Sequence, residues 1–153
     1  MAQTTLKDIH DQLESAQRRS GFFDAVAMHE PKNEPGEGVT AATWLQRAEP
    51  ARGASGLAST SVRIEVVTRL YTNMLSESAD AIDPAVYAAA DHLINAYSGD
   101  FDLGGTVRNV DLLGAHGEPL HMRAGYLRQG PVLYRVADIV TPIIVNDLWS
   151  QTA

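Results

Sequence analysis

The sequence contains no cysteine, and this absence excludes several classes of protein. A chain without thiols holds no disulfide scaffold and no thiolate-ligated zinc or iron–sulfur centre. It also has no apolar run of about 18 residues, the length that a membrane-spanning helix needs. Of its 153 residues, 44% are hydrophobic and 20% are charged, which is typical of one globular domain covering residues 1–153. The N-terminal segment lacks the apolar core of a signal peptide, so we expect the protein to stay in the cytoplasm where it is made.

Positive charge is scarce in the middle of the chain. Residues 77–118 hold eight acids and one base, Arg108, so this segment alone matches the formal net charge of −7. Two interpretations remain open. The segment is a solvated helix with its flanking loops, or it forms a negative surface that repels nucleic acid or steers a basic partner. In either case the acidic balance argues against binding of a phosphate backbone as the main function.

Two segments have the periodicity of amphipathic helices. In residues 5–20, apolar side chains recur at helical spacing, with a threonine at the start and a glycine just beyond the end. Asp83 and Pro84 favour the start of a second helix, with Asp as the N-cap and Pro at the first helical position. This helix closes at Gly99, and its apolar stripe consists of Val86, Ala89, Ala90, Leu93, Ile94 and Tyr97.

Six further segments have the alternation or composition of β-strands. They are residues 22–29, 39–47, 61–74, 106–113, 120–129 and 132–145. Two connections between them are long and rich in turn-forming residues, and residues 49–60 are expected to form a flexible functional loop. Pro142 lies inside the last apolar run, where it would remove a ladder hydrogen bond, so we expect an edge position or a bulge there.

The segment 61–74 is the clearest strand. Its apolar residues fall on one face, while Arg63, Glu65 and Arg69 point to the other face. At about 3.3 Å per residue this strand would span about 46 Å. A compact domain of this length has a diameter of roughly 38 Å. We therefore expect the strand to bend or to project, and a projecting strand needs a partner such as a neighbouring subunit.

The order of the elements favours an α+β fold. We expect two layers, a mainly antiparallel β-sheet with two helices packed on one face, and a long projecting strand and loop.

Groups that carry chemistry do not converge in this sequence. Gly53-Ala-Ser-Gly56 lacks the glycine that ends a nucleophile elbow, because Leu57 follows. His116 and His121 flank a turn, and no helical spacing forces them to share a metal ion. We predict no catalytic, cofactor or metal site and no enzymatic activity.

Seven stretches of the sequence, taken in order, carry a resemblance to a known family. They are Gly56–Arg63, Arg69–Met74, Ala96–Phe101, Val107–Gly114, Ala124–Tyr126, Tyr134–Ile139 and Ile144–Trp149. At this spacing the chain resembles the tail terminator proteins of long-tailed (siphovirus-type) bacteriophages, especially those that infect actinobacteria. The resemblance covers roughly residues 39–149, and the first helix more loosely.

The resemblance implies a structural virion protein of the tail and neck, assembled in the host cytoplasm. Tail terminators form a hexameric ring on the head-proximal end of the tail tube, stop its polymerisation and join the tail to the head. The implied partners are other copies of the chain, the major tail tube protein and the head–tail connector or stopper protein. Genomic DNA would pass through the lumen without specific binding, and no membrane is involved. The alternatives are another neck component, such as a head-closure or tail-completion protein, and a small enzyme or ligand-binding domain.

Two sets of residues are candidates for these contacts. We expect a subunit or tail-tube interface at Arg52, Leu57, Arg63, Arg69, Tyr71, Arg108 and Trp149. For Arg63, Arg69 and Arg108, solvent exposure with pairing to acids such as Glu65 is an equal alternative. For Trp149, packing within the chain is the simpler interpretation. We expect acidic side chains to line the lumen at Glu77, Asp80, Asp100, Asp102 and Asp111, although a solvated loop around Asp100 and Asp102 is the simpler interpretation.

Overall fold

The computed structural model describes residues 5–20, 25–27, 39–51, 61–73, 79–99, 107–115 and 117–146. The expected α+β class is confirmed: a mainly antiparallel sheet carries two helices. The elements are α1 (Leu6–Ser20), β1 (Ala25–Ala27), β2 (Val39–Pro50), β3 (Ser61–Asn73), α2 (Ala79–Gly99), β4 (Asn109–Val110), β5 (His121–Gln129) and β6 (Val132–Asn146).

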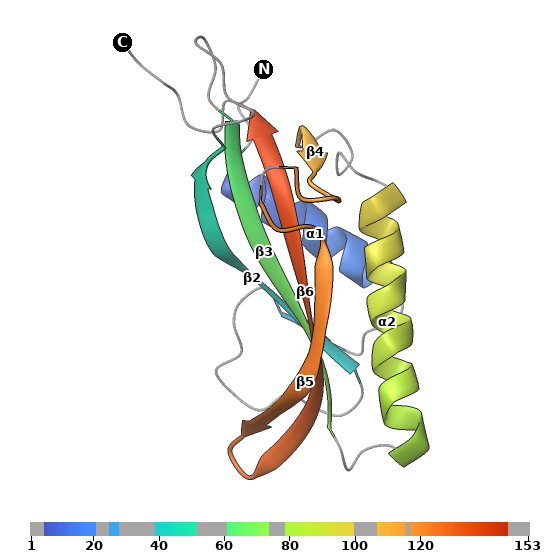
Figure 1. Ribbon diagram of the computed structural model, residues 1–153. Helices are drawn as coiled ribbons and strands as arrows, with labels where there is room; N and C mark the ends of the chain where they lie inside the picture. The colour runs from blue at the N-terminus through green and yellow to red at the C-terminus, as the bar shows by residue number, and fades with distance from the viewer. Residues whose placement is uncertain are drawn as a thin grey trace, which may run out of the picture.

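The sheet is ordered β1-β2-β3-β6, and both β4 and β5 pair with the far side of β6 (Figure 1). All of these pairs are antiparallel except β1 with β2. β5 and β6 form a hairpin across Gly130 and Pro131, as the sequence predicts. Gly130 has a φ of 61°, which a two-residue hairpin turn requires at its first central position.

Alternation along β3 creates the two faces of the sheet, as the sequence predicts. The apolar face packs against both helices and forms the main core, in which Ile9 and Leu13 of α1 meet Leu93 of α2 and Ile64 of β3. The opposite face carries Arg63, Glu65, Val67, Arg69 and Tyr71, and no helix among the described elements covers it (Figure 1).

The long strand bends within the fold and does not project, which is the first of the two outcomes that its length led us to expect. β3 pairs with β2 from Val62 to Thr72 and with β6 from Ser61 to Asn73, so both of its edges are occupied within one chain. The length is accommodated because the whole sheet twists and curves (Figure 1). The open strand edges lie elsewhere, on the outer sides of β2 and β5.

Two prolines occupy positions that the sequence did not predict. Pro84 lies inside α2, which begins at Ala79 and not after Asp83. Packing of the apolar stripe offsets the lost main-chain hydrogen bond, which lies near the start of this 21-residue helix. Pro142 lies in the central strand β6 and not at an edge. The Pro142 carbonyl accepts a hydrogen bond from Asp111 N at 2.9 Å. β4 pairs with β6 only beyond this residue and β5 only before it, so no strand on that side needs the N–H that proline lacks.

The segment expected to form a strand at 106–113 is mostly not a strand. Only Asn109 and Val110 pair with β6 in the described part of that segment, and turns follow at Leu112 and Leu113. Residues 111–115 and 117–120 then lie back toward β3, where Arg63 holds them, as described below.

α1 is fixed at its start by a capping box. Thr5 N donates to Asp8 Oδ2 at 2.8 Å, and Asp8 N donates to Thr5 Oγ1 at 3.2 Å. These hydrogen bonds lower the pKa of Asp8. Further along, the buried Gln17 amide donates to Thr43 Oγ1 at 2.6 Å and lies 3.4 Å from the Tyr97 hydroxyl, so it ties α1 to β2 and α2.

Candidate interaction surfaces

A buried arginine organises one end of the open sheet face. The Arg63 side chain is 3% exposed, and its Nη1 lies 2.6 Å from Glu65 Oε1. Its Nε lies 3.5 Å from Asp111 Oδ2, and its Nη2 donates to the Glu118 carbonyl. We call Arg63, Glu65, Asp111 and Glu118 the Arg63 cluster. The guanidinium therefore joins β3 to two points of the connection between β4 and β5.

The Arg63 cluster fixes the path of residues 111–120. Asp111 Oδ1 accepts from Ala115 N at 2.8 Å, and Gly114 adopts a φ of 73° that favours glycine. A Cβ at Gly117 would lie 2.6 Å from Arg63 Cζ, so glycine is needed where the backbone crosses the guanidinium. The loop therefore covers Arg63 and shields it from solvent.

A second ion pair lies further along the same face. Arg69 Nε lies 2.6 Å from Asp138 Oδ1, and Nη2 lies 2.9 Å from Oδ2, so the pair is bidentate and joins β3 to β6. These bonds raise the pKa of Arg69. The guanidinium also lies 5.3 Å from the Trp44 ring centroid. Next to it, Tyr71 and Tyr134 are buried edge to face at 6.0 Å.

Between these two ion pairs the open face is hollowed. A polar depression of about 550 Å³ is lined by side chains of both signs from β2, β3, β5 and β6, among them Arg47, Glu65, Arg123 and Asp138. A surface with charges of both signs suits contact with solvent or with another protein better than it suits binding of a purely anionic or purely cationic ligand. The described residues contain no group of three or more His, Asp or Glu side chains that could hold a metal ion.

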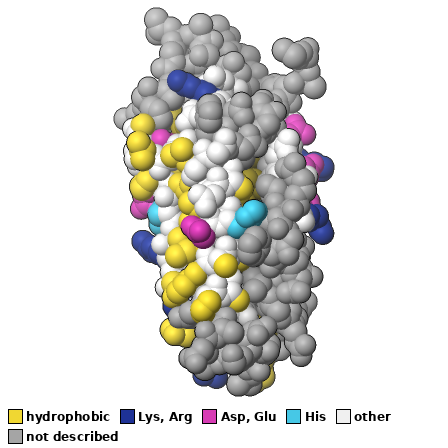
Figure 2. Space-filling model, turned by 90° about the vertical axis from the view of Figure 1, so that its right-hand side faces the viewer, with side chains coloured by type: hydrophobic (Ala, Val, Ile, Leu, Met, Phe, Trp, Pro, Cys, Tyr) yellow, Lys and Arg dark blue, Asp and Glu magenta, His cyan; other side chains and the backbone are white. Residues whose placement is uncertain are grey.

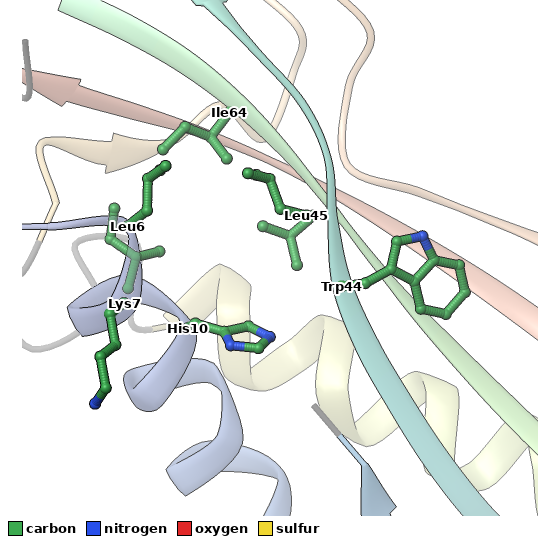
Figure 3. Close-up of a pocket in the computed structure, with 8 residues that line it drawn as sticks. Leu6, Lys7, His10, Trp44, Leu45 and Ile64 are labelled. Atoms are coloured by element: carbon green, nitrogen blue, oxygen red, sulfur yellow. The ribbon is translucent and has the colours of Figure 1, made fainter. Parts of the chain in front are cut away.

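An apolar groove opens on the face that carries the helices, beside the part of β2 that follows its pairing with β1. It encloses about 270 Å³, and its walls include Leu6 and Ile9 of α1, Leu45 of β2 and Ile64 of β3. Figure 3 shows the side chains of Leu6, Leu45 and Ile64 gathered around this space, with the Trp44 ring on the other side of β2. Leu45 is 42% exposed at the mouth. We call this feature the α1 groove.

The opposite edge of the sheet is also apolar and exposed. Of the β5 side chains on the helix-side face, Met122 is 37% exposed and Tyr126 is 61% exposed. Tyr87 of α2 and Leu133 of β6 lie on the same side of the sheet and are also exposed. Figure 2 looks onto this side and shows hydrophobic side chains gathered in its lower left part. Arg135 ties the patch together, since it contacts the Tyr87 hydroxyl at 3.0 Å and the Tyr126 ring centroid at 4.6 Å.

The structure places several of the predicted residues inside the fold. Arg63 was expected at a subunit contact and Asp111 on a channel wall, but they are buried against each other. Tyr71 was also expected at an interface and is 1% exposed, because it packs on Tyr134. Arg69 is partly exposed and engaged by Asp138. Arg108 is exposed, as an interface residue would be.

For the remaining predicted residues, the structure describes no side chain. Asp80 lies in α2, but its side chain is not described. The other candidates lie outside the described residues: Arg52, Leu57, Trp149, Glu77, Asp100 and Asp102.

Sequence reasoning missed the two exposed apolar features. Met122, Ala124 and Tyr126 stand at alternate positions of a predicted strand, so their common face was readable from the sequence. That no element covers this face could not be read, because it depends on where α2 packs. Among the described helices, neither is long and apolar enough to cross a membrane.

Comparison with known proteins gives a match in structure alone. No family model matches the chain, and no curated protein matches it in sequence. Among solved structures, the fold is similar to the sheath/tube terminator of an extracellular contractile injection system, PVC, in its extended state. The TM-score is 0.47 and the sequence identity is 9%, over 100% of this chain and 62% of that chain. The chain thus spans less than two thirds of the length of the protein it matches.

Proposed function

We propose that this chain is a structural tail terminator: a ring that caps the head-proximal end of a long phage tail tube. The ring stops tube polymerisation and offers the surface to which the head connector attaches. In this proposal the partners are further copies of the chain, the major tail tube protein and the connector or stopper protein, and the genome passes through the ring.

The observation that carries the proposal is where the resembling stretches lie in the fold. Gly56–Arg63 and Val107–Gly114 meet through the Arg63–Asp111 pair, which is 3% and 4% exposed. Arg69–Met74 and Tyr134–Ile139 meet through the bidentate Arg69–Asp138 pair. Four of the seven stretches are therefore parts of one sheet face and not scattered matches. These links show that the stretches carrying the resemblance act together in one fold, and the function proposed for that fold is argued by analogy.

The charge of the chain also supports passage of DNA without binding. Each copy has a formal charge of −7, so a closed ring would repel a duplex that touched its wall. Glu77, Asp80, Asp100 and Asp102 remain the proposed lumen residues. Asp111 is not among them, since Arg63 neutralises it inside the fold.

A capping assay with purified components tests this function. Tail tube protein polymerises in the presence or absence of the chain, and tube lengths are measured by negative-stain electron microscopy. A terminator shortens the tubes in proportion to its concentration and leaves density at one end of each tube. Unchanged lengths with no end density would contradict the proposal. Binding to isolated connector without any effect on tubes would assign the chain to another part of the neck.

A further inference from the structure

We propose that copies of this chain join edge to edge, with β5 of one copy pairing antiparallel to β2 of the next and the β5 side chains entering the α1 groove. The occupant of the groove is thus a second copy of the same chain. This inference rests on the ring of the proposed function and names the surfaces that close it.

Both strands have a free edge of nearly equal length. On its outer side, β2 pairs with β1 over residues 40–42 only. Among the described residues, no strand pairs with the outer side of Thr43–Pro50. β5 pairs with β6 on one side throughout its length, and the part of the chain that the structure describes contains no strand on its other side. Rows of unpaired N–H and C=O groups are templates for another strand.

The side chains beside these edges are complementary. A strand laid along Thr43–Pro50 brings its helix-side residues to the mouth of the α1 groove, next to Leu45. The helix-side residues of β5 are Met122, Ala124 and Tyr126, followed by Arg128 at the turn end of the strand, and all four are exposed. The contact therefore removes an exposed Tyr and Met from water and fills an apolar space of about 270 Å³.

Only one of the two edges has charge of a single sign. β5 contains Arg123 and Arg128 and no acid, and both are exposed. The α1–β2 side exposes acids beside bases: Glu49, 42% exposed, pairs with Arg47, and Asp8 follows Lys7, whose side chain is 82% exposed. Glu49 and Asp8 are the groups that the β5 arginines can meet at the rim, where such charges affect register and rate of formation more than affinity.

The strand directions allow a ring to close. β2 is antiparallel to β3, β3 to β6 and β6 to β5, so β2 and β5 run in opposite directions. Rotation of a copy about an axis along the strands preserves these directions, so its β2 arrives antiparallel to β5 of the first copy. Each copy then uses one edge of each kind, which is the heterologous contact that generates closed rings.

Disulfide trapping tests the contact, because the natural chain has no cysteine. Leu45→Cys is combined with Met122→Cys, Ala124→Cys or Tyr126→Cys in one chain, so that the three pairs cover the neighbouring registers. Tails assembled with each variant are oxidised and run on denaturing gels without reductant. We expect at least one pair to give a ladder of covalent oligomers up to the full ring, which reductant collapses to monomers.

Matched variants separate this contact from others. The pair Leu45→Cys and Leu113→Cys uses a side chain that is 93% exposed and off both edges, and it is expected to give no ladder. A mixture of the two single variants of the successful pair is expected to give dimers only. Cross-linked dimers of one single variant alone would mean a two-fold contact and would overturn the inference. The inference would also be overturned if all three double-cysteine variants capped tails and none of them gave a ladder.

A charge-insertion series gives a second, independent readout. Tyr126→Asp is expected to keep the fold, because the side chain is 61% exposed, and to abolish the ring and tube capping. Leu113→Asp is the control and is expected to change neither. If a double-cysteine variant gives the ladder but neither it nor the natural chain changes tube lengths, the proposed function fails while this contact stands. If Tyr126→Asp caps tubes as the natural chain does, the contact fails while the function stands.

Discussion

Replacement of Arg63 by methionine should destabilise the fold far more than a surface charge does. Methionine keeps much of the side-chain length but leaves the Asp111 and Glu65 carboxylates, 4% and 13% exposed, without this cation. It also removes the donor to the Glu118 carbonyl. Breaking a buried pair by removing one partner costs about 3–5 kcal/mol. For a domain of this size that corresponds to a fall in Tm of roughly 6–20 °C.

The matched control for this change lies on the same sheet face. Arg47 pairs with Glu49 at 2.7 Å, two residues along its strand, as Arg63 pairs with Glu65, but its side chain is 61% exposed. Arg47→Met should therefore cost less than about 1 kcal/mol. Urea unfolding followed by circular dichroism gives both values under the same conditions.

A triple variant separates charge from packing. Combining Arg63→Met with Glu65→Gln and Asp111→Asn removes the uncompensated charges, so it should regain about half of the lost stability. The reasoning would be refuted if Arg63→Met cost no more than Arg47→Met, or if the triple variant were less stable than Arg63→Met alone.

Three further changes test other parts of the fold. Gly117→Ala brings a Cβ against the pinned Arg63 guanidinium and should cost about 1–3 kcal/mol in urea unfolding, whereas Gly99→Ala, which meets nothing within 4 Å, serves as its control. Gln17→Leu removes the buried amide that joins α1 to Thr43 and should cost about 1–3 kcal/mol, with a neutral result contradicting the assigned link. Burial raises the pKa of the Tyr97 phenol above 10.0, so the native state retains a proton that the unfolded chain releases. Stability should therefore fall as the pH rises above about 10, and a pH titration of Tm with no alkaline fall would contradict this.

Local periodicity predicted most of the fold. The alternation in residues 61–73 gave both faces of β3, and the helical spacing gave α1 to within one residue. The hairpin at Gly130 and Pro131 followed from turn chemistry. These features depend on neighbours in the sequence, so sequence patterns contain the information that forms them.

The site could not be predicted in the same way. Alternation places Arg63 on the open face, but its burial comes from residues 111–120, which fold back over it from far along the chain. The same distant contact buries Asp111, which in the sequence looks like one more member of an acidic segment. Likewise the helix-side face of β5 is exposed because α2 packs on β3 and β6, and this placement depends on contacts between distant segments.

Tail length in the absence of the gene tests the central claim most directly. A phage with this gene deleted would be examined as a crude lysate by electron microscopy, with the gene supplied in trans as the control. The account predicts abnormally long tails without heads, restored to normal length and joined to heads by complementation. Normal-length tails beside unjoined full heads, or normal infectious particles, would contradict it.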